Sequence, residues 1–485
     1  MNRFQFKFKP IHAFIFLLSV FIYSCTLPKE LQLSDRLKPA EKFYKVDEHV
    51  QKETSLPEWR TFFKDPYLIA LIDTALHHNQ DLKMASQRML QNQAALQYHT
   101  RKFYPSVNAS LAYGLRRFGE YTIDGVGNFD TNLSPNIRPE QRMPVNLPDY
   151  FLGFESSWEI GVAGKLRKRR QAALNRYLAS AEWKNYVQTQ VVSGLARYYY
   201  ELLAVDNELK IIRQNLAIQE RAIEIVAIQK QSGQINELAV KQFQVQLLQT
   251  RALEADRKQH QVAVENALNS LAGRFSQHIP RADTLMNTQQ LTQIQTGLPA
   301  SLLNHRTDLR EAMAQLNANE AELLAVRAAF YPSLNVNGFI ALNGFNINYL
   351  FNPASLAFMG LAGLTAPLLN RNELNYQHQW QAAERNIAIY NYQRIWLESV
   401  AEVSSLFNSM QAYEQVSELK FNEVTELKQA SSIANDLFLT GYANYLEVLM
   451  VRRNVLEAEL QLTNARKEFL HSYIDLYKAL GGGWN

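Results

Sequence analysis

Few residues in this 485-residue chain have the types and spacing that chemistry requires. His77 and His78 are adjacent, but neither has a carboxylate or a further histidine at helical metal-ligand spacing, so surface histidines are the simpler interpretation. The glycines at 481–483 lack the following Lys-Ser/Thr of a phosphate-binding loop. A single cysteine excludes a disulfide framework and a cysteine-cluster metal site. The sequence therefore predicts no catalytic residue, no metal site and no enzyme.

The single cysteine, Cys25, follows a segment with the layout of a signal peptide. A basic stretch without acids precedes an apolar run over 11–23, which is shorter than the roughly 20 residues of a membrane-spanning helix. The junction Ser24-Cys25 resembles a bacterial lipobox. That resemblance implies cleavage after residue 24, acylation of Cys25 and, because Thr26 rather than Asp follows, sorting to the outer membrane. An ordinary signal peptide with an incidental cysteine is the alternative.

Charge and hydropathy exclude further classes of protein. The 50 Lys and Arg against 46 Asp and Glu give a net charge of +4, whereas a nucleic-acid binder needs a strongly basic face. The mean hydropathy of −0.27 excludes a polytopic helical membrane protein. We therefore expect no nucleic-acid partner and no cofactor beyond the covalent lipid on Cys25.

The chain contains a tandem duplication. The segment from Asp81 to Ser106 aligns with Asp308 to Ser333 at an offset of 227, and both copies end in Phe-Tyr-Pro-Ser. The segment from Gly233 to Gly273 aligns with Gly441 to Gly481 at an offset of 208. The difference, 227 − 208 = 19 residues, is a net insertion in the first copy. It is placed in the Gly- and Pro-rich stretch 116–149, which is interpreted as an extended loop.

Each copy predicts two strands and several long helices. Residues 105–115 alternate between apolar and small or polar side chains, as do 150–160, and 333–345 and 356–366 repeat the pair. Residues 66–102 read as one helix. A longer helix over 165–230 carries five heptads of a/d spacing, a coiled-coil signal, and a second helix covers 236–272. The second copy repeats these two helices at 370–437 and 443–480.

The predicted organisation has five parts. A signal peptide over 1–24 precedes an acylated tail over 25–59. The first repeat covers 60–273, a linker covers 274–305, and the second repeat covers 306–483. Four strands in one chain cannot close a barrel, and an open sheet edge in lipid leaves backbone groups unpaired. Three chains would supply twelve strands, enough for a water-filled lumen.

Three sequence motifs connect the chain to a known family. They are the segment Gly297–Arg310, the two Phe-Tyr-Pro-Ser strand starts, and the segment Trp158–Arg167. With the duplication, the chain resembles the TolC-like outer-membrane efflux proteins, in particular their lipoprotein branch of NodT-type outer-membrane factors. The family usually has Pro at the position of Thr307 and Asp at that of Gly161.

The resemblance implies a fold and partners. The fold is α+β, mainly long helices in coiled-coil packing, with four strands per chain in a trimeric, twelve-stranded outer-membrane barrel continued by a periplasmic α-helical tunnel. The function is a passive channel that exports small molecules such as drugs. The partners are two further copies, a periplasmic adaptor, an inner-membrane pump of the RND type and outer-membrane lipid. A type I protein-secretion duct and a lipoprotein adaptor or scaffold without a pore are the alternatives.

The resemblance also indicates two sites. The loop around Gly441, matched by Gly233, corresponds to the periplasmic entrance, where acidic side chains close the axis. Residue-by-residue matching places Glu447 at one acidic position, while Met450 and Ala239 occupy the others. Phe438 and Tyr442 are expected to pack at this tip or to contact the adaptor.

The second site is the basic run at the start of the long helix, just under the membrane in the family layout. We expect it to contact anionic headgroups, with a solvated helix start as the alternative. It consists of Lys165, Arg167, Lys168, Arg169 and Arg170.

Overall fold

The computed structural model describes residues 56–282, 304–367 and 372–484. Within these ranges the chain forms two compact units. Unit 1 contains residues 92–177 and the described part of 315–388, and unit 2 contains the remaining described residues. Each unit combines parts of both sequence repeats, because the longest helices pass from one unit to the other. The predicted signal peptide, Cys25 and most of the linker 274–305 lie outside the described residues.

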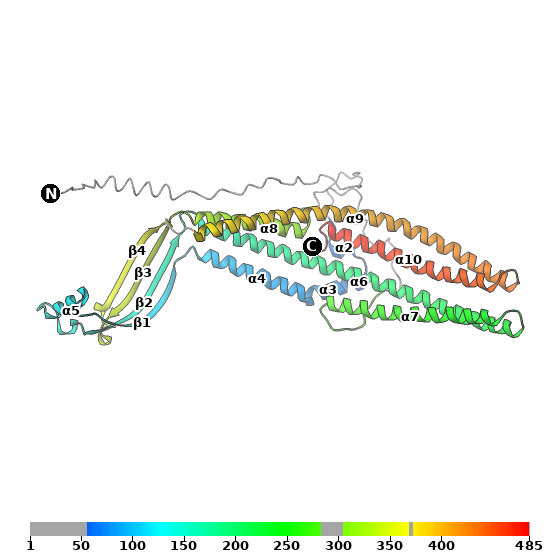
Figure 1. Ribbon diagram of the computed structural model, residues 1–485, viewed down its shortest axis with the longest axis horizontal. Coiled ribbons are helices and arrows are strands. Elements are labelled where there is room, and N and C mark those ends of the chain that lie inside the picture. Colours follow the sequence, from blue (N-terminus) through cyan, green and yellow to red (C-terminus); the bar gives the residue numbers. More distant parts are fainter. Residues whose placement is uncertain (1–55, 283–303, 368–371, 485) are drawn as a thin grey trace, which may run out of the picture. The chain divides into compact units, whose positions relative to one another are not determined.

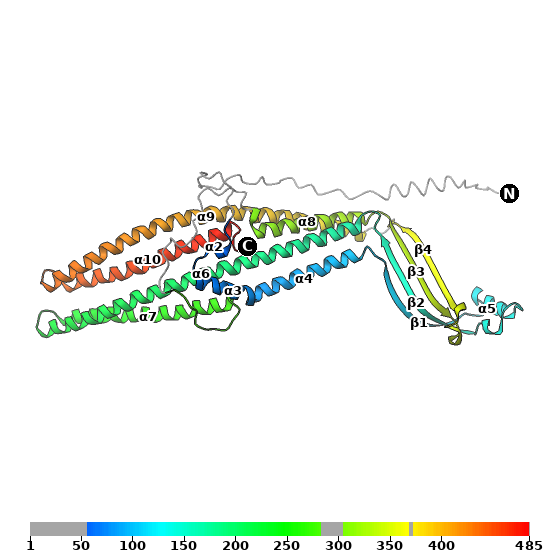
Figure 2. The same ribbon diagram turned by 180° about the vertical axis from the view of Figure 1, so that it is seen from behind.

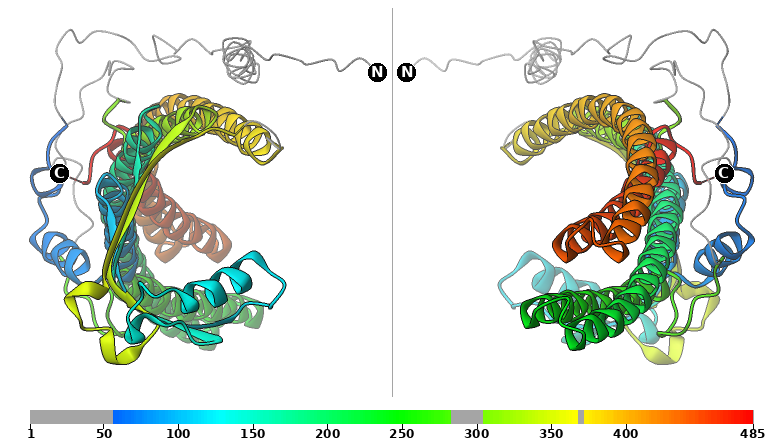
Figure 3. Two further views of the ribbon diagram at one scale, coloured as in Figure 1. Left: turned by 90° about the vertical axis from the view of Figure 1, so that its left-hand side faces the viewer. Right: turned by 90° about the vertical axis from the view of Figure 1, so that its right-hand side faces the viewer.

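Unit 1 is built on one antiparallel sheet with the strand order β1-β2-β3-β4 (Figure 1). The strands are β1 (Ser106–Arg117), β2 (Asn146–Ile160), β3 (Ser333–Gly344) and β4 (Leu356–Thr365). The strand pair of the first repeat is thus joined to that of the second repeat through β2 and β3. Viewed from its end, the sheet is a curved layer with a hollow side (Figure 3). Strands β1 and β4 are its two edges.

The connection between β1 and β2 differs from the expected extended loop over 116–149. It contains an 11-residue helix, α5 (Ile123–Leu133), and a short 3-10 turn, η1 (Pro139–Gln141). Thr122 caps α5, since its hydroxyl accepts a hydrogen bond from the amide of Gly125 at 3.0 Å. The extended-loop prediction was wrong because the glycines of this stretch permit a close turn before the helix instead of preventing helix formation. The β3–β4 connection has only two 3-10 turns, η4 (Ile347–Tyr349) and η5 (Pro353–Ser355).

The helices occur in matched pairs from the two repeats. Helices α4 (Gln80–Arg101) and α8 (Thr307–Ala328) both have 22 residues. Helix α6 (Lys165–Gln231) has 67 residues and α9 (Asn372–Leu439) has 68. Helices α7 (Glu237–Leu271) and α10 (Tyr445–Ala479) both have 35. Both side views show α6 with α7, and α9 with α10, as antiparallel hairpins (Figures 1 and 2). No helix in the described ranges has the length and apolar character needed to cross a membrane.

The helix expected over 66–102 is interrupted at Asn79. Helix α3 (Pro66–His78) ends there and α4 begins at Gln80. The side chain of Asn79 accepts a hydrogen bond from the amide of Leu82 and donates one to the carbonyl of Leu271, at the end of α7. Asn79 therefore caps one helix while binding another that is distant in the sequence, and local periodicity cannot reveal this second partner.

The core of unit 2 forms where the first residues that the structure describes pack onto the long helices. Helix α2 (Trp59–Phe62) inserts Phe62, which stacks on Tyr477 of α10 at a centroid distance of 3.9 Å. Most of the heptad seam predicted in α6 is buried, from Leu195 to Val226. Tyr198 departs from it and is 42 % exposed, while its neighbour Tyr199 is buried and donates to the fully buried carboxylate of Asp65 at 2.6 Å.

Candidate functional site: strand faces and helix tips

One face of the sheet is apolar across all four strands. Residues paired directly across antiparallel strands lie on the same face. The register aligns Leu111 with Leu152, Leu152 with Leu342, and Leu342 with Leu356. The neighbouring row contains Phe154, Ile340 and Phe358, and the last of these is 79 % exposed. A contiguous exposed apolar surface of this kind indicates a contact with lipid or protein.

The opposite face has polar pairs between the strands. Ser110 donates to Glu155 at 2.7 Å, and Asn343 donates to Asp149 at 2.8 Å. Phe151 and Phe339 also lie on this face and meet edge to face, so the face is mixed rather than uniformly polar. The register thus places Glu155 and Phe154 on opposite faces, as the alternation predicted.

The two hairpin tips share one backbone design. Gly233 and Gly441 end α6 and α9 with φ values of +75° and +81°, in the left-handed region that favours glycine. The amide after each glycine donates to a carbonyl five residues earlier, Gln229 or Leu437, which closes the helix end. Asn236 and Asn444 then cap α7 and α10 with their side-chain oxygens. The two asparagines align in the sequence repeats but were not predicted to be caps, although an asparagine just before an apolar helical segment is a capping signal.

The acids of the two tips differ in their partners. Glu237 in the first turn of α7 forms ion pairs with Lys230 and Lys241. Glu447, in the first turn of α10, is exposed and accepts a hydrogen bond from the Asn444 amide at 3.1 Å. No lysine or arginine of the described chain lies within ion-pair distance of Glu447. Its negative charge is therefore available to ions or to other molecules, whereas that of Glu237 is compensated.

Side chains other than the expected aromatics pack at the tips. Tyr442 is 85 % exposed and Phe438 is half-buried. The contact between the two hairpins instead comes from Tyr445 and Leu449 of α10, which pack against a buried cluster of the first hairpin. That cluster includes Ala239, Val226, Val240 and Phe243. Ala239 has no exposed surface, so this position serves packing.

The basic run at the start of α6 divides into two sets. Lys165 pairs with Glu159 at the end of β2 at 2.5 Å, and Arg169 lies 3.9 Å from Glu322 of α8. Lys168 donates to Gln171. Arg167 and Arg170 are exposed and form no ion pair with a described residue. These two are the exposed residues of the run that have no carboxylate partner in the described chain, so they are best placed to meet an external anion.

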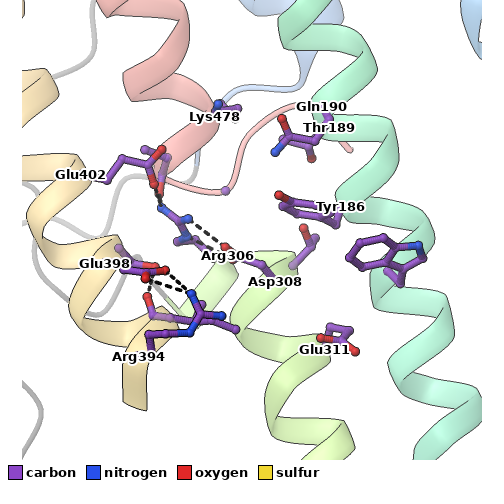
Figure 4. A pocket seen from close by; sticks show the side chains of 16 residues that line it. Tyr186, Thr189, Gln190, Arg306, Asp308, Glu311, Arg394, Glu398, Glu402 and Lys478 are labelled. Carbon is purple, nitrogen blue, oxygen red and sulfur yellow. Dashed lines mark hydrogen bonds and ion pairs between the residues drawn. The ribbon is translucent and has the colours of Figure 1, made fainter. Parts of the chain in front are cut away.

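A polar pocket of about 550 Å³ lies in unit 2 among α6, α8, α9 and the end of α10. Its centre is Arg306, which is only 12 % exposed (Figure 4). Arg306 donates to Asp308 at 2.8 Å, to Glu402 of α9 at 2.7 Å and to the carbonyl of Ala479 at 2.9 Å. Burial, together with the charge of Asp308, raises the pKa of Glu311. Since each acid next to Arg306 is neutralised by it, the pocket has the character of a structural ion-pair network.

The start of α8 accounts for the expectation that either Thr307 or proline can occupy this position. Thr307 is the first residue of α8, a position at which the backbone amide has no helical acceptor and proline is also favourable.

Among the described residues, no three His, Cys, Asp or Glu side chains are grouped so that they could hold a metal ion.

The model of the outer membrane efflux protein family matches residues 71–274 and 298–482. These two segments cover most of the chain and follow its two repeats. The chain belongs to the outer membrane efflux protein family. Members of the family are channel proteins rather than enzymes, and this outer membrane efflux protein is a passive channel of the outer membrane.

The chain aligns with related efflux proteins over most of their length. The chain is 26 % identical to the solvent efflux pump outer membrane protein SrpC of Pseudomonas putida over 434 residues, which are 89 % of this chain and 88 % of SrpC. It is 26 % identical to the cation efflux system protein CusC of Escherichia coli over 88 % of each chain. A crystal structure of CusC superposes with a TM-score of 0.79, at 24 % identity, over 92 % of this chain and all of the other. The predicted TolC-like fold is therefore confirmed.

Proposed function

We propose that three copies of this efflux protein join their sheets, β1 of one copy beside β4 of the next, into a twelve-stranded barrel that conducts small molecules out of the cell. The observation that carries the proposal is the exposed apolar face that crosses all four strands, while the edge strands β1 and β4 each pair with only one strand among the described residues. In lipid, each unpaired backbone group costs several kcal/mol, so a sheet of this kind is stable only when closed. Closure by three copies pairs both edges and leaves the apolar face toward lipid.

The native mass of the protein extracted from outer membranes in mild detergent tests this proposal. We expect three chains, each without residues 1–24 and each with a lipid on Cys25. The lipid is part of the same proposal, because two or more acyl chains anchor stably whereas one binds marginally. A monomer that high salt releases from the membrane would overturn the barrel of three copies.

We also propose that Arg167 and Arg170 contact lipid phosphates at the periplasmic surface of the membrane. They are exposed, and the neighbouring Lys165 and Arg169 already have carboxylate partners. A basic side chain near an anionic surface contributes about 1 kcal/mol. Reversal of both charges to glutamate should weaken insertion, whereas unchanged insertion would contradict the contact.

We propose that a periplasmic adaptor and an inner-membrane pump of the RND type are the partners, and the exposed side chains of the second hairpin tip support the contact with the adaptor. Leu439, Tyr442 and Met450 are between 59 % and 85 % exposed. A photoreactive amino acid at Tyr442 should cross-link to an adaptor in whole cells, and the same amino acid at the buried Phe243 should not. The compounds that pass are expected to be selected by the pump.

A further inference from the structure

Helix α5 presents an apolar face that no described residue of its own chain covers. Ile123, Val126, Phe129 and Leu133 recur at helical spacing and are between 57 % and 93 % exposed. An isolated helix of this length is marginally stable in water. Four exposed apolar side chains on such a helix therefore require a partner surface.

The position of α5 is fixed by specific contacts rather than left to a loose loop. The side chain of Asn132 exchanges two hydrogen bonds with the backbone of Met143, both at 2.8 Å. At the other end, a Cβ atom on Gly125 would lie 2.0 Å from the carbonyl oxygen of Gly119, so this turn accepts only glycine. The faces of α5 directed at its own loop are thus occupied by Gly125 and Asn132, and the apolar face is left outward.

The direction of α5 indicates what covers it. Figure 3 shows that α5 extends from the strand ends over the hollow side of the curved sheet. In a closed barrel the hollow side faces the axis, where symmetry brings the same helix of each copy together. Only the first repeat has this helix, so each copy supplies one.

Charge disfavours a membrane surface as the alternative occupant. Helix α5 contains Asp124 and Asp130 and no lysine or arginine. Amphipathic helices that lie on anionic lipid usually have basic residues on the polar face. The two carboxylates would be repelled by such a surface, whereas at the edge of a contact between copies they remain hydrated.

We infer that the apolar faces of three α5 helices pack against one another and form a lid across the outer mouth of the barrel. This inference rests on the proposed trimer. In this inference, the 19-residue insertion restricts the outer end of the barrel. That role is separate from the closure expected at the helix tips at the other end of the channel.

Cysteine cross-linking in the full-length membrane protein tests the lid. Under mild oxidation, Phe129→Cys should give covalent dimers on a denaturing gel, in severalfold excess over Thr131→Cys. Thr131 is an exposed residue on the opposite side of the same helix. The unaltered chain controls for Cys25. Equal cross-linking at both positions, or none at Phe129, would overturn the lid.

Two further measurements test whether α5 restricts the channel and whether it lies on the membrane instead. Phe129→Asp should raise single-channel conductance severalfold, while Thr131→Asp should leave it unchanged. If Phe129→Trp fluorescence is quenched by brominated lipid, the helix lies on the membrane and the inference is wrong. A native mass of three chains without cross-linking overturns the lid alone, whereas a monomer overturns the proposed trimer.

Discussion

At the scale of single residues, Arg306 connects more of the molecule than any sequence pattern suggested. Its guanidinium reaches α8, α9 and the last turn of α10 at once. The segment 297–310 was singled out as a motif of the resemblance, and Arg306 gives that motif a physical reason. A buried charge with several partners is costly to lose because the partners remain without compensation.

Arg306→Gln should destabilise the protein by about 3 kcal/mol, the low end for a broken buried pair, because the partly buried Asp308 and Glu402 would keep their charges without a counterion. The melting temperature of the detergent-solubilised protein measures the effect. Arg394→Gln is a matched control, since Arg394 pairs with Glu398 in the exposed part of the same pocket and such pairs contribute about 1 kcal/mol or less. Equal losses in the two variants would contradict the network.

Glu447 is the tip acid without a cationic partner in the described chain, so its charge should act on passing ions. Glu447→Gln is expected to lower the cation selectivity of single channels in planar bilayers. The substitution removes three symmetry-related carboxylates, and with them the negative potential that attracts cations to the axis. Glu457→Gln is the control, as it removes the same charge from an exposed position farther along α10. Selectivity that is unchanged in Glu447→Gln would show that this acid is not near the conduction path.

At the scale of elements, the sheet has two faces with different requirements. The apolar face would meet lipid and the mixed face would meet water. Because the side chains of a strand alternate, neighbouring residues of β1 should respond in opposite ways to the same substitution.

Leu111→Lys should reduce insertion into the outer membrane, since a lysine in the lipid-facing part of a barrel costs about 2–4 kcal/mol near the midplane. Ser110→Lys should be tolerated, because Ser110 lies on the other face and Glu155 is within hydrogen-bond distance. Heat-resistant oligomers in outer-membrane fractions report insertion. Comparable loss in both variants would contradict the assigned faces.

The elements also show what a sequence can and cannot predict. The duplication and the strand faces were predictable because their signals are local and repeated. The break at Asn79 was not, since the contact that accompanies it is with Leu271, 192 residues away. Helix α5 was missed because glycine and proline dominate its surroundings. Tyr445 and Leu449 were missed because their partners lie on another hairpin.

At the scale of the whole molecule, the stability of the fold is linked to pH through a histidine that is buried in its neutral form. His471 of α10 is 7 % exposed and donates from Nε2 to the carbonyl of Arg197 at 3.1 Å. Burial lowers the pKa of His471, and the charge of Arg197 lowers it further, while Glu201 and Glu468 oppose the shift. The folded protein therefore binds a proton at His471 less readily than the unfolded chain.

The linkage gives a direction for acid stability. Below about pH 6.5, the unfolded chain takes up a proton at this histidine before the folded protein does, so stability falls as the pH falls. His471→Gln should reduce the drop in melting temperature between pH 7.5 and a pH of about 5.5. The exposed His77→Gln should leave it unchanged. An identical drop in all three proteins would contradict the linkage.

The equal lengths of the two hairpins restrict how the length of the helical part can change during evolution. Helices α7 and α10 have the same number of residues, and α6 and α9 differ by one. The hairpins are held together near their ends by Tyr445 and Leu449, so an added residue in one of them would shift this contact by about 1.5 Å. A length change that preserves the contact between the hairpins must occur in both of them. It must also come in steps of about seven residues in each helix, so that the heptad seam stays buried. The distance that the tunnel spans should therefore evolve in discrete, paired increments of about 10 Å rather than continuously.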